Sequence, residues 1–417
     1  MIHKKRVIIV GGGVVGAACA HFLLGTGWQV TMVEKGTFGG GCSHGNCGLV
    51  CPSHVLPLAG PGVLLKTLKA MCRSNSPFYI KPRFDLKLWR WLLAFAMKCN
   101  RRSMLRIGHS RWDLLQSSLG LYQQLMAEQT LSCEWEQRGT LYVYRTPQEF
   151  KAYVETDWLM RTEFDLPGVP YAGDEVSQLE PALKPGLAGG WHYPTDAHLR
   201  PDRLMSSWKK SLLAAGLELR EGCTMREFRI RRGVAQALLT GEGEELEAEK
   251  FVLCAGAFTP GIGARLGCRI PVQPGKGYSL TMPRPAVCPS IPLLFPEHKV
   301  VVTPWASGYR IGSTMEFSGF DASHSPRRLA LLAAGATPYL HEPTATPVLE
   351  TWSGFRPMTT DDNPIIGPCP GVPNVYLSTG HGMLGITLAP ATGKLLAELL
   401  NQQTPHVDPT PFAVDRF

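Results

Sequence analysis

The sequence lacks the features that would place it in several broad classes of protein. No apolar run reaches the roughly eighteen residues needed to cross a bilayer, so we expect no transmembrane helix. The twelve cysteines follow no ladder of spacings, which argues against a disulfide framework and favours a reducing compartment. Charged residues make up only 18% of the 417 residues and hydrophobic residues 44%, so we expect a folded chain of two or three structural domains.

The basic residues lack the clustering that is typical of nucleic-acid binding. Lysines and arginines are scattered and no basic-aromatic motif accompanies them, so we predict no nucleic-acid partner. The formal net charge of +8 nevertheless favours an anionic partner. A carboxylate substrate, a phosphate-bearing cofactor and an anionic membrane surface would each satisfy that preference.

Two apparent motifs near the N-terminus lack the rest of their pattern. Cys42, Cys47 and Cys51 match no metal-site spacing and have no evident fourth ligand, so we predict small buried cysteines and no metal. The basic start His3-Lys4-Lys5-Arg6, an apolar run and Ala18-Cys19-Ala20 imitate a secretion signal. We reject the signal because the same run holds three spaced glycines, which a phosphate-binding loop needs and a secretion signal does not.

The N-terminus does contain the full pattern of a dinucleotide-binding unit. Val7–Val10 is a β-branched run typical of a buried parallel strand. A helix is predicted from Ala17 to about Leu24 and a second strand from Trp28 to Val33, with a GxGxxG turn before the helix and an acid after the second strand. A lone GxGxxG is weak, but strand, turn, helix, strand and acid in this order make the signal strong.

The residues of this unit fit the chemistry of a dinucleotide. Gly11 permits the tight turn, Gly13 lets the backbone approach the pyrophosphate, and Gly16 lets helix and strand pack closely. The helix N-terminus offers unpaired N–H groups and a positive dipole end to the phosphates. Glu34 lies where a carboxylate can accept hydrogen bonds from ribose hydroxyls. The motif alone leaves FAD and NAD open.

A second unit of this kind is predicted downstream. A helix over Leu204–Ala215 and a strand at Leu217–Leu219 precede another apolar strand, Phe251–Cys254. Ala255 and Gly256 then form a small-residue turn, which either approaches a ligand or simply connects a strand to a helix.

The C-terminal segment favours a flavin. A strand at Val375–Ser378 is followed by the glycine-punctuated loop Thr379–Thr387 and by a helix from Leu388 to about Leu400, with Pro390 in its first turn. Such a loop at a helix N-terminus suits negative charge. In flavin enzymes this charge develops at the pyrimidine end of the reduced isoalloxazine, where a helix dipole stabilises it.

With these pieces in place, the chain resembles, end to end, the superfamily of FAD-dependent D-amino-acid dehydrogenases and glycine or sarcosine oxidases. Within it the chain looks most like bacterial D-amino-acid and D-hydroxyproline dehydrogenases. It departs from the oxidases at Met383, where they often have a second arginine, and from the dehydrogenases at Thr360-Asp361-Asp362, where they have Pro-Asp-Gly. The similarity rests on Ser43-His44-Gly45-Asn46, Pro57–Gly62, the Trp-rich basic stretch to Cys99, Lys276–Ser279, Arg310–Glu316, Gly354-Phe355-Arg356-Pro357, Asp361 and Pro364–Gly367.

The resemblance implies an α/β fold arranged as in p-hydroxybenzoate hydroxylase. It has a Rossmann-like FAD-binding domain and a discontinuous antiparallel-sheet substrate domain. The sequence is compatible, because residues 138–145 and 296–316 alternate like strands and residues 86–130 look mostly helical. We expect the FAD-binding domain at 1–80, 198–270 and 345–417, and the substrate domain at 81–197 and 271–344.

The cofactor contacts that the resemblance implies come from several separate parts of the chain. They lie in the glycine turn, after the second strand, in the loop that follows, at the small-residue turn and in the C-terminal loop. The set is Gly11, Gly13, Val15, Gly16, Glu34, Lys35, Ser43, His44, Gly45, Asn46, Gly48, Met225, Ala255, Gly256, Gly354, Gly380, His381, Gly382, Met383, Gly385, Ile386 and Thr387.

The resemblance also implies three catalytic residues, Arg356, Tyr278 and His44. An arginine fork suits an amino-acid carboxylate, and Arg356 has the position of the family's Gly-Leu-Arg-Pro arginine; the alternative is a salt bridge at the surface or between domains. Tyr278 is expected as an aromatic lid or hydroxyl partner, with a packed core tyrosine as the alternative. His44 and His381 are expected to contact the flavin, although a lone histidine is usually structural.

The activity that the resemblance implies is FAD-dependent dehydrogenation of a small amino acid, either a D-amino acid or a D-hydroxyproline-like compound. We expect hydride transfer from the α-carbon to flavin N5, hydrolysis of the imino acid by water, and electron transfer to a quinone or another non-oxygen acceptor. Two alternatives stay open: an oxygen-using glycine, sarcosine or proline-type amine oxidase, and a flavoprotein subunit of a larger dehydrogenase complex.

The stretch Arg83–Arg102 bears on the location of the protein. It interleaves tryptophans, leucines and a phenylalanine with basic residues, as amphipathic helices on anionic membranes do. We favour a helix that packs its aromatics on the core and solvates its charges. We therefore expect a cytoplasmic protein, with peripheral attachment to the inner face of the cell membrane as the alternative.

Overall fold

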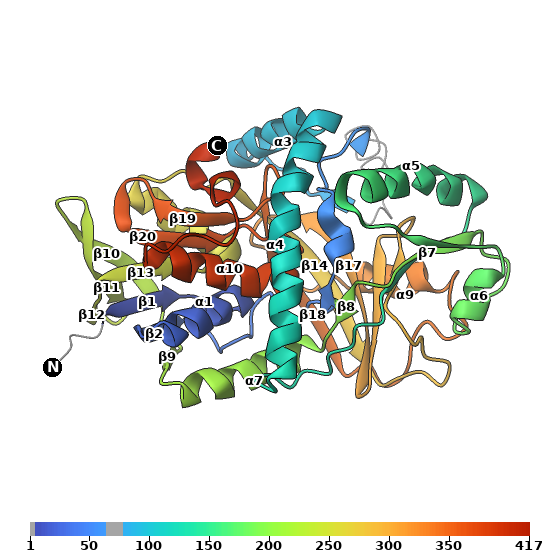
Figure 1. The fold of residues 1–417 in the computed structure, drawn as a ribbon, viewed down its shortest axis with the longest axis horizontal. Coiled ribbons are helices and arrows are strands. Elements are labelled where there is room, and N and C mark those ends of the chain that lie inside the picture. The colour runs from blue at the N-terminus through green and yellow to red at the C-terminus, as the bar shows by residue number, and fades with distance from the viewer. Residues whose placement is uncertain (1–4, 64–77) are drawn as a thin grey trace.

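The computed structural model describes residues 5–63 and 78–417, which form two large sheets lying side by side (Figure 1). His3 and Lys4 of the apparent secretion signal lie outside the described residues. One sheet is mostly parallel and the other mostly antiparallel, so the predicted α/β fold class is confirmed. Within the described ranges, no helix combines the length and the apolar character needed to span a bilayer.

The first sheet has a buried parallel strand at its centre, as the β-branched run predicted. Its alternate side chains point to opposite faces, so Val7 and Ile9 contact a helical layer while Ile8 and Val10 contact a small antiparallel sheet. In spatial order its strands are β19 (Ile365–Cys369), β20 (Val372–Thr379), β13 (Lys250–Leu253), β1 (Arg6–Val10), β2 (Gln29–Glu34) and β9 (Glu218–Glu221). The covering elements are α1 (Val14–Gly25), α10 (Gly385–Leu400), β10 (Met225–Arg231), β11 (Val234–Thr240) and β12 (Glu245–Glu247).

The second sheet has nine strands and carries α9 (Pro326–Ala336) on one face. Its opposite face looks toward the loop that follows β2. In spatial order the strands are β18 (Glu350–Thr359), β14 (Val272–Met282), β17 (Gly308–Phe317), β16 (Val300–Trp305), β15 (Leu293–Phe295), β5 (Thr140–Tyr144), β7 (Gly189–Tyr193) and β6 (Val169–Ala172), with β4 (Phe78–Ile80) beside β17.

The long helix α4 (Arg101–Ala127) packs against α10 and crosses the junction of the two sheets in the view of Figure 1. The predicted helical region at 86–130 is in fact two helices, because the Asn100 side chain accepts a hydrogen bond from the Ser103 N–H and caps the second one. The remaining elements are α3 (Leu86–Lys98), α5 (Pro147–Phe164), α6 (Glu175–Leu179), α7 (Pro201–Ala214), α8 (Thr259–Gly263), the strand pair β3 (Leu49–Val50) and β8 (Ala197–His198), and 3₁₀ turns at Pro52–Val55, Gly256–Phe258, Ala264–Leu266, Thr410–Phe412 and Val414–Arg416.

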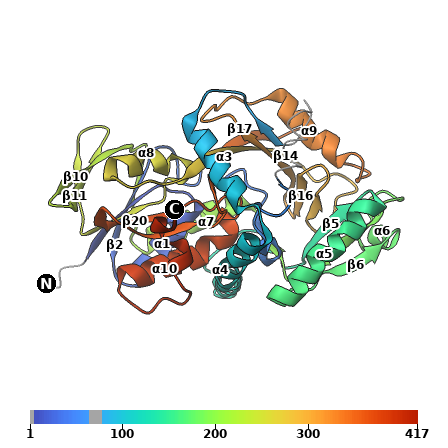
Figure 2. The same ribbon diagram turned by 90° about the horizontal axis from the view of Figure 1, so that it is seen from above.

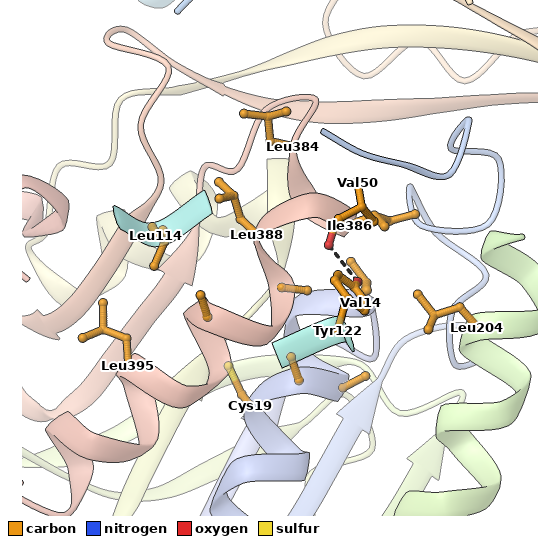
Figure 3. Close-up of a cluster of buried hydrophobic side chains, with 14 of the residues drawn as sticks. Val14, Cys19, Val50, Leu114, Tyr122, Leu204, Leu384, Ile386, Leu388 and Leu395 are labelled. Atoms are coloured by element: carbon orange, nitrogen blue, oxygen red, sulfur yellow. Dashed lines mark hydrogen bonds between the residues drawn. The ribbon is translucent and has the colours of Figure 1, made fainter. Parts of the chain in front are cut away.

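Helix α10 corrects one prediction. It begins at Gly385 rather than Leu388, so Pro390 lies in its second turn and leaves the Ile386 carbonyl without its usual donor within the helix. The Tyr122 hydroxyl of α4 donates a hydrogen bond of 2.8 Å to that carbonyl (Figure 3). The Ser118 hydroxyl donates to the next carbonyl, that of Thr387, at 2.5 Å. Helix α4 therefore compensates for the proline.

The pairing of β18 differs from what the predicted domain division implies for this strand. This strand falls in the segment 345–417, expected in the FAD-binding domain, yet it pairs along its whole length with β14 of the nine-stranded sheet. It also contacts the turn at Gly256–Phe258 of the first sheet. β18 thus links the two halves of the molecule, and the exact division stays a prediction.

Candidate active site

A cavity of about 780 Å³ opens between the two sheets. Its walls come from segments far apart in the sequence, because the carboxyl ends of β1, β2, β13 and β20 meet there and β18 closes the other side. Most of the residues that line it lie within 10–15, 33–35, 39–49, 223–226, 254–265, 352–357 and 378–387, and the others are His54, Tyr278, Val301, Ser313, Ala322 and His324.

The glycine turn after β1 is shaped by its lack of side chains. Gly11 has a φ of +111°, and a Cβ there would lie 2.5 Å from the Cys254 carbonyl oxygen. A Cβ on Gly16 would overlap the Gly11 carbonyl oxygen, so Gly16 permits the contact of α1 with the turn. Gly11 therefore permits the tight turn and Gly16 the close packing that the sequence predicted. The N-terminus of α1 faces the cavity.

Two polar side chains hold this turn in place. The Glu34 carboxylate accepts hydrogen bonds of 2.8 Å from the backbone N–H groups of Gly12 and Gly36. The Ser43 hydroxyl accepts one of 2.9 Å from the Val14 N–H at the start of α1. The carboxylate is thereby fixed beside the glycine turn, where a ribose would present its hydroxyls.

The loop before α10 forms the opposite end of the cavity wall. Gly380 and Gly382 adopt positive φ angles of +76° and +53°, and the Gly382 N–H donates to the Pro357 carbonyl oxygen. His381 is buried, and burial lowers its pKa to about 3, so its ring is neutral. Its Nε2 lies 3.0 Å from the Thr392 hydroxyl of α10, which fixes the ring. The first N–H groups of α10 point into this region, where they can stabilise negative charge.

Arg356 lies on the cavity side of β18. Its Nη1 donates a hydrogen bond of 2.7 Å to the Thr314 carbonyl oxygen, and a Cβ on Gly277 would overlap its guanidinium. Burial lowers its pKa, although a guanidinium remains charged at neutral pH. In the described part of the chain no carboxylate forms an ion pair with it. A charged guanidinium on a cavity wall, with donors that no described residue accepts from, can bind a carboxylate.

The carbonyl that anchors Arg356 lies in an irregular part of β17. Ser313 and Thr314 have φ angles of +109° and +51°, and the pairing of β14 with β17 shifts register here. Such positive φ angles cost energy in residues with a Cβ and are concentrated at functional sites. The bulge directs the Thr314 carbonyl at the arginine.

The structure places His44 away from the cavity wall. Its Nε2 lies 2.6 Å from the Glu350 carboxylate, and His44 is absent from the residues that line the cavity. Arg310, which is 1% exposed, donates hydrogen bonds to the carbonyl oxygens of His44 and Asn46 at 2.8 and 2.7 Å. His44 therefore serves with Glu350 and Arg310 to hold the loop after β2 on the nine-stranded sheet.

Tyr278 and Arg356 lie on opposite faces of the sheet. In the β14–β18 register, Gly275 pairs with Arg356 and Gly277 with Gly354, so even-numbered Tyr278 projects to the other side. Its side chain is 1% exposed, and its hydroxyl donates a hydrogen bond of 2.9 Å to Glu316. Tyr278 is nevertheless one of the residues that line the cavity, so its role as a lid or hydroxyl partner stays a prediction, as does the alternative of a packed core tyrosine.

Most of the predicted cofactor residues lie together around the cavity. Gly16, His44, Gly48 and Gly380 do not line it, and the structure gives Gly48 a packing role because a Cβ there would overlap the Leu199 carbonyl oxygen. Those that do line it are Gly11, Gly13, Val15, Glu34, Lys35, Ser43, Gly45, Asn46, Met225, Ala255, Gly256, Gly354, His381, Gly382, Met383, Gly385, Ile386 and Thr387.

Several cavity residues were missed from the sequence. Trp352 lies on the same face of β18 as Arg356, and its indole covers both Gly45 and Gly354, where a Cβ would overlap it. Its spacing of four from Arg356 on one strand was the available signal. His54 also lines the cavity, and burial with the nearby Arg111 cation lowers its pKa to about 4. Nothing in its sequence context pointed to that place.

The cysteines near this loop are thiols. Cys42 and Cys47 line the cavity, and burial raises the pKa of Cys42 to about 11 and also raises that of Cys47. Among the described residues, no three His, Cys, Asp or Glu side chains gather as metal ligands, and the described cysteines are unpaired.

The cavity has the parts that an FAD molecule needs. A tight glycine turn, a fixed carboxylate and two helix N-termini lie around one cavity, and they suit the pyrophosphate, the ribose and the flavin of this cofactor.

Comparisons with known proteins agree with this geometry. Residues 6–399 match the family model described as FAD dependent oxidoreductase (DAO). The chain is 32% identical to a D-amino acid dehydrogenase of Methylobacterium nodulans over 96% of both chains, and 32% identical to one of Xanthobacter autotrophicus over 99% of both. It is similar in fold to glycine oxidase from Bacillus cereus, with a TM-score of 0.75 and 23% identity over 97% of this chain and 99% of that one. The chain thus belongs to the DAO family of FAD-dependent oxidoreductases, and FAD is its cofactor.

Proposed function

We propose that this flavoenzyme dehydrogenates a small D-amino acid, or a D-hydroxyproline-like compound, and passes the electrons to a quinone or a similar non-oxygen acceptor. The observation that carries the proposal is Arg356, a guanidinium on the wall of the cofactor cavity that makes one hydrogen bond, to the Thr314 carbonyl oxygen, among the described residues. The names of the related D-amino acid dehydrogenases support the D configuration and an acceptor other than oxygen.

The residues of the chain supply binding and orientation. When bound, FAD takes up the hydride that the amino acid loses from its α-carbon. Arg356 binds the substrate carboxylate by a fork of charge-assisted hydrogen bonds, which fixes the α-carbon and supplies most of the rate by positioning. The N-terminus of α10 stabilises the negative charge that reduction produces. His381, neutral and tied to Thr392, keeps the loop before that helix in place.

We further propose that the predicted residues that line the cavity make the cofactor contacts. In this assignment Gly11 and Gly13 approach the pyrophosphate, Glu34 binds the adenosine ribose, and Gly382 to Thr387 surround the flavin. The hydrogen bonds to Glu34 and the positive φ of Gly11 support the assignment of the turn.

Helix α3 supports a peripheral membrane location on the cytoplasmic side. It buries Leu88 and Trp91 against β17 and β18 of the nine-stranded sheet, as the interpretation of a core-packed helix required. Figure 2 shows it lying between α8 and the strands β14 and β17. Its outward face nevertheless carries exposed apolar side chains beside basic ones, which suits an anionic lipid surface. The exposed apolar residues of this stretch are Phe84, Leu86, Trp89, Leu93 and Met97, and the basic ones are Lys87, Arg90, Lys98, Arg101 and Arg102.

An anaerobic absorbance experiment tests the proposed function. The holoenzyme is mixed with D-alanine, D-proline, D-hydroxyproline, glycine or sarcosine, and the L enantiomers serve as matched controls. We expect a D compound to bleach the flavin band near ~450 nm and its L enantiomer to leave it unchanged. A flavin that none of these compounds reduces would refute the proposal.

The acceptor is tested on the reduced enzyme. We expect a water-soluble quinone to restore the flavin band much faster than air does. Rapid reoxidation by air with release of one peroxide per flavin would instead identify an oxygen-using amine oxidase. Failure of the isolated chain to turn over with either acceptor, despite reduction by substrate, would identify a subunit of a larger complex.

A further inference from the structure

We propose that the substrate pocket selects amino acids with uncharged side chains and that Trp352 forms the wall that limits side-chain length. The proposal rests on the proposed function, since it takes Arg356 as the receptor of the α-carboxylate. It names the class of substrate, and it can fail while the amino-acid dehydrogenase assignment stands.

The first argument is the distribution of carboxylates. Among the described residues that line the cavity, Glu34 is the one acid, and it accepts hydrogen bonds at the glycine turn. Glu316 is held by Tyr278 on the face of the sheet opposite Arg356. Glu350 is on the same face as Arg356 but outside the cavity lining, where it is paired with His44.

A cationic side chain would therefore find no carboxylate partner among the described residues of the pocket. A lysine-like ammonium or an arginine-like guanidinium would lose its hydration and would meet the positive charge of Arg356. Burying an unpaired charge is among the most unfavourable steps in binding. The neutral analogue of the same shape avoids both costs.

A substrate with an acidic side chain would also bind poorly. Arg356 is occupied by the α-carboxylate in this arrangement, and its Nη1 is also bound to the Thr314 carbonyl. Arg310 lies on the same face but donates its hydrogen bonds to backbone carbonyls of the loop after β2. Neither guanidinium is left free for an acidic side chain.

Two thiols act electrostatically on Arg356, and the other basic side chains that line the cavity are Lys35, which lies over the Phe258 ring, Arg226, Arg265, which donates to the Arg226 carbonyl oxygen, and the imidazoles of His54, His324 and His381. The thiols of Cys42 and Cys47 remain protonated at neutral pH because burial raises their pKa values. His54 is neutral, since burial and Arg111 lower its pKa to about 4. Trp352 adds an apolar ring.

Trp352 is placed to limit side-chain length. Its indole spreads from Gly45 to Gly354, and Gly354 is two residues from Arg356 on the same face of β18. A substrate anchored by its carboxylate on Arg356 meets this ring at the glycine that separates them. The two glycines leave no side chain of their own, so the ring is the boundary.

The charge preference is tested with isosteric substrate pairs on the holoenzyme. We expect kcat/KM for D-norleucine to exceed that for D-lysine at least 30-fold, and D-asparagine to exceed D-aspartate at least 10-fold. Binding is measured separately with the unreactive pair hexanoate and 6-aminohexanoate, through the perturbation of the flavin spectrum. We expect hexanoate to bind at least 10-fold more tightly. Equal values within either substrate pair, or within the binding pair, would overturn the proposal.

The length limit is tested with Trp352→Phe. We expect the ratio of kcat/KM for D-norleucine to that for D-alanine to rise at least 5-fold. The matched control is Trp158→Phe, a tryptophan that is 54% exposed on α5, which leaves the ratio unchanged. An unchanged ratio in Trp352→Phe, with the flavin still bound, would remove Trp352 as the boundary. If no amino acid reduces the flavin in any variant, the proposed function fails instead.

Discussion

At the residue scale, we expect the planar shape of the Arg356 guanidinium to matter more than its charge for the proposed binding of the substrate carboxylate. Arg356→Lys retains the positive charge but loses the planar pair of donors. We expect kcat/KM to fall by about 100-fold, mainly through KM, because two charge-assisted hydrogen bonds become one at most. Steady-state kinetics with saturating acceptor measures this. Flavin content serves as the control, and a KM within twofold of the parent would contradict the assignment.

Gly277 controls the position of that guanidinium from the neighbouring strand. A Cβ there would overlap the Arg356 guanidinium, so Gly277→Ala must displace the side chain that we propose binds the substrate. We expect KM to rise about 10-fold or more, since a misplacement of about 1 Å in a positioned site is costly. The matched control is Gly120→Ala in α4, where nothing lies within 4 Å of the new methyl group and KM stays constant. Equal KM values in the two variants would be incompatible with this packing.

The limits of prediction from sequence are clearest for single residues. Gly11, Gly13 and Glu34 could be placed because one local strand–turn–helix unit fixes their geometry. Arg310 could not, although its segment was noticed, because it contacts a loop 264 residues away in sequence. Tyr278 shows a related difficulty: the face of a strand depends on register, and a single residue's shift reverses it.

At the scale of elements, α4 and α10 form a matched pair. The Tyr122 hydroxyl supplies the donor that Pro390 denies to the Ile386 carbonyl. We expect Tyr122→Phe to reduce the free energy of unfolding by about 1–3 kcal/mol, because a buried carbonyl loses its partner.

The double variant with Pro390→Ala makes this prediction specific. Alanine restores an N–H at position 390, so the Ile386 carbonyl regains a donor within the helix. In the Pro390→Ala background, Tyr122→Phe should therefore reduce the free energy of unfolding much less. Urea unfolding of the four proteins measures the coupling, with Tyr171→Phe as a control for removal of a hydroxyl. Strictly additive costs would mean that the two residues do not share the carbonyl.

The exposed face of α3 predicts binding to anionic lipid vesicles. We expect the holoenzyme to sediment with vesicles that contain phosphatidylserine and to remain in solution with phosphatidylcholine alone, and salt should weaken the binding. Trp89→Ser should reduce binding several-fold, because Trp89 is 57% exposed on the outward face. Trp158→Ser, with similar exposure on α5, is the control. An equal loss of vesicle binding in both variants would show that α3 does not form the membrane contact.

At the scale of the whole molecule, buried imidazoles dominate the response to acid. The pKa values of His54, His198 and His381 are lowered mainly by burial, to about 4, about 4 and about 3. In the unfolded chain these groups titrate near ~6.5, so it binds protons that the folded chain does not. Their contribution to stability is present at pH 7 and is lost as the pH falls from about 6.5 toward 4.

Asp196 changes the pH dependence of stability in the direction opposite to that of the three histidines. Burial raises its pKa to about 6, so its contribution is present in acid and is lost as the pH rises through about 6. Three imidazoles outweigh one carboxyl, and we expect the free energy of unfolding to decrease from pH 6.5 to pH 4.5. Asp196→Asn should steepen this decrease by up to about 1.4 kcal/mol per pH unit. Urea titrations at several pH values measure it, and a shallower slope would contradict the sign.

The cavity wall has a consequence for the life of the protein in the cell. Its segments begin at Val10 and end at Thr387, so only the completely folded chain can assemble it. A ligand that binds the folded chain alone stabilises it, by about 2.7 kcal/mol when its concentration is 100 times its Kd. We therefore expect the abundance of this protein, as well as its activity, to fall in riboflavin-starved cells, because the chain without FAD unfolds more often and is degraded by proteases.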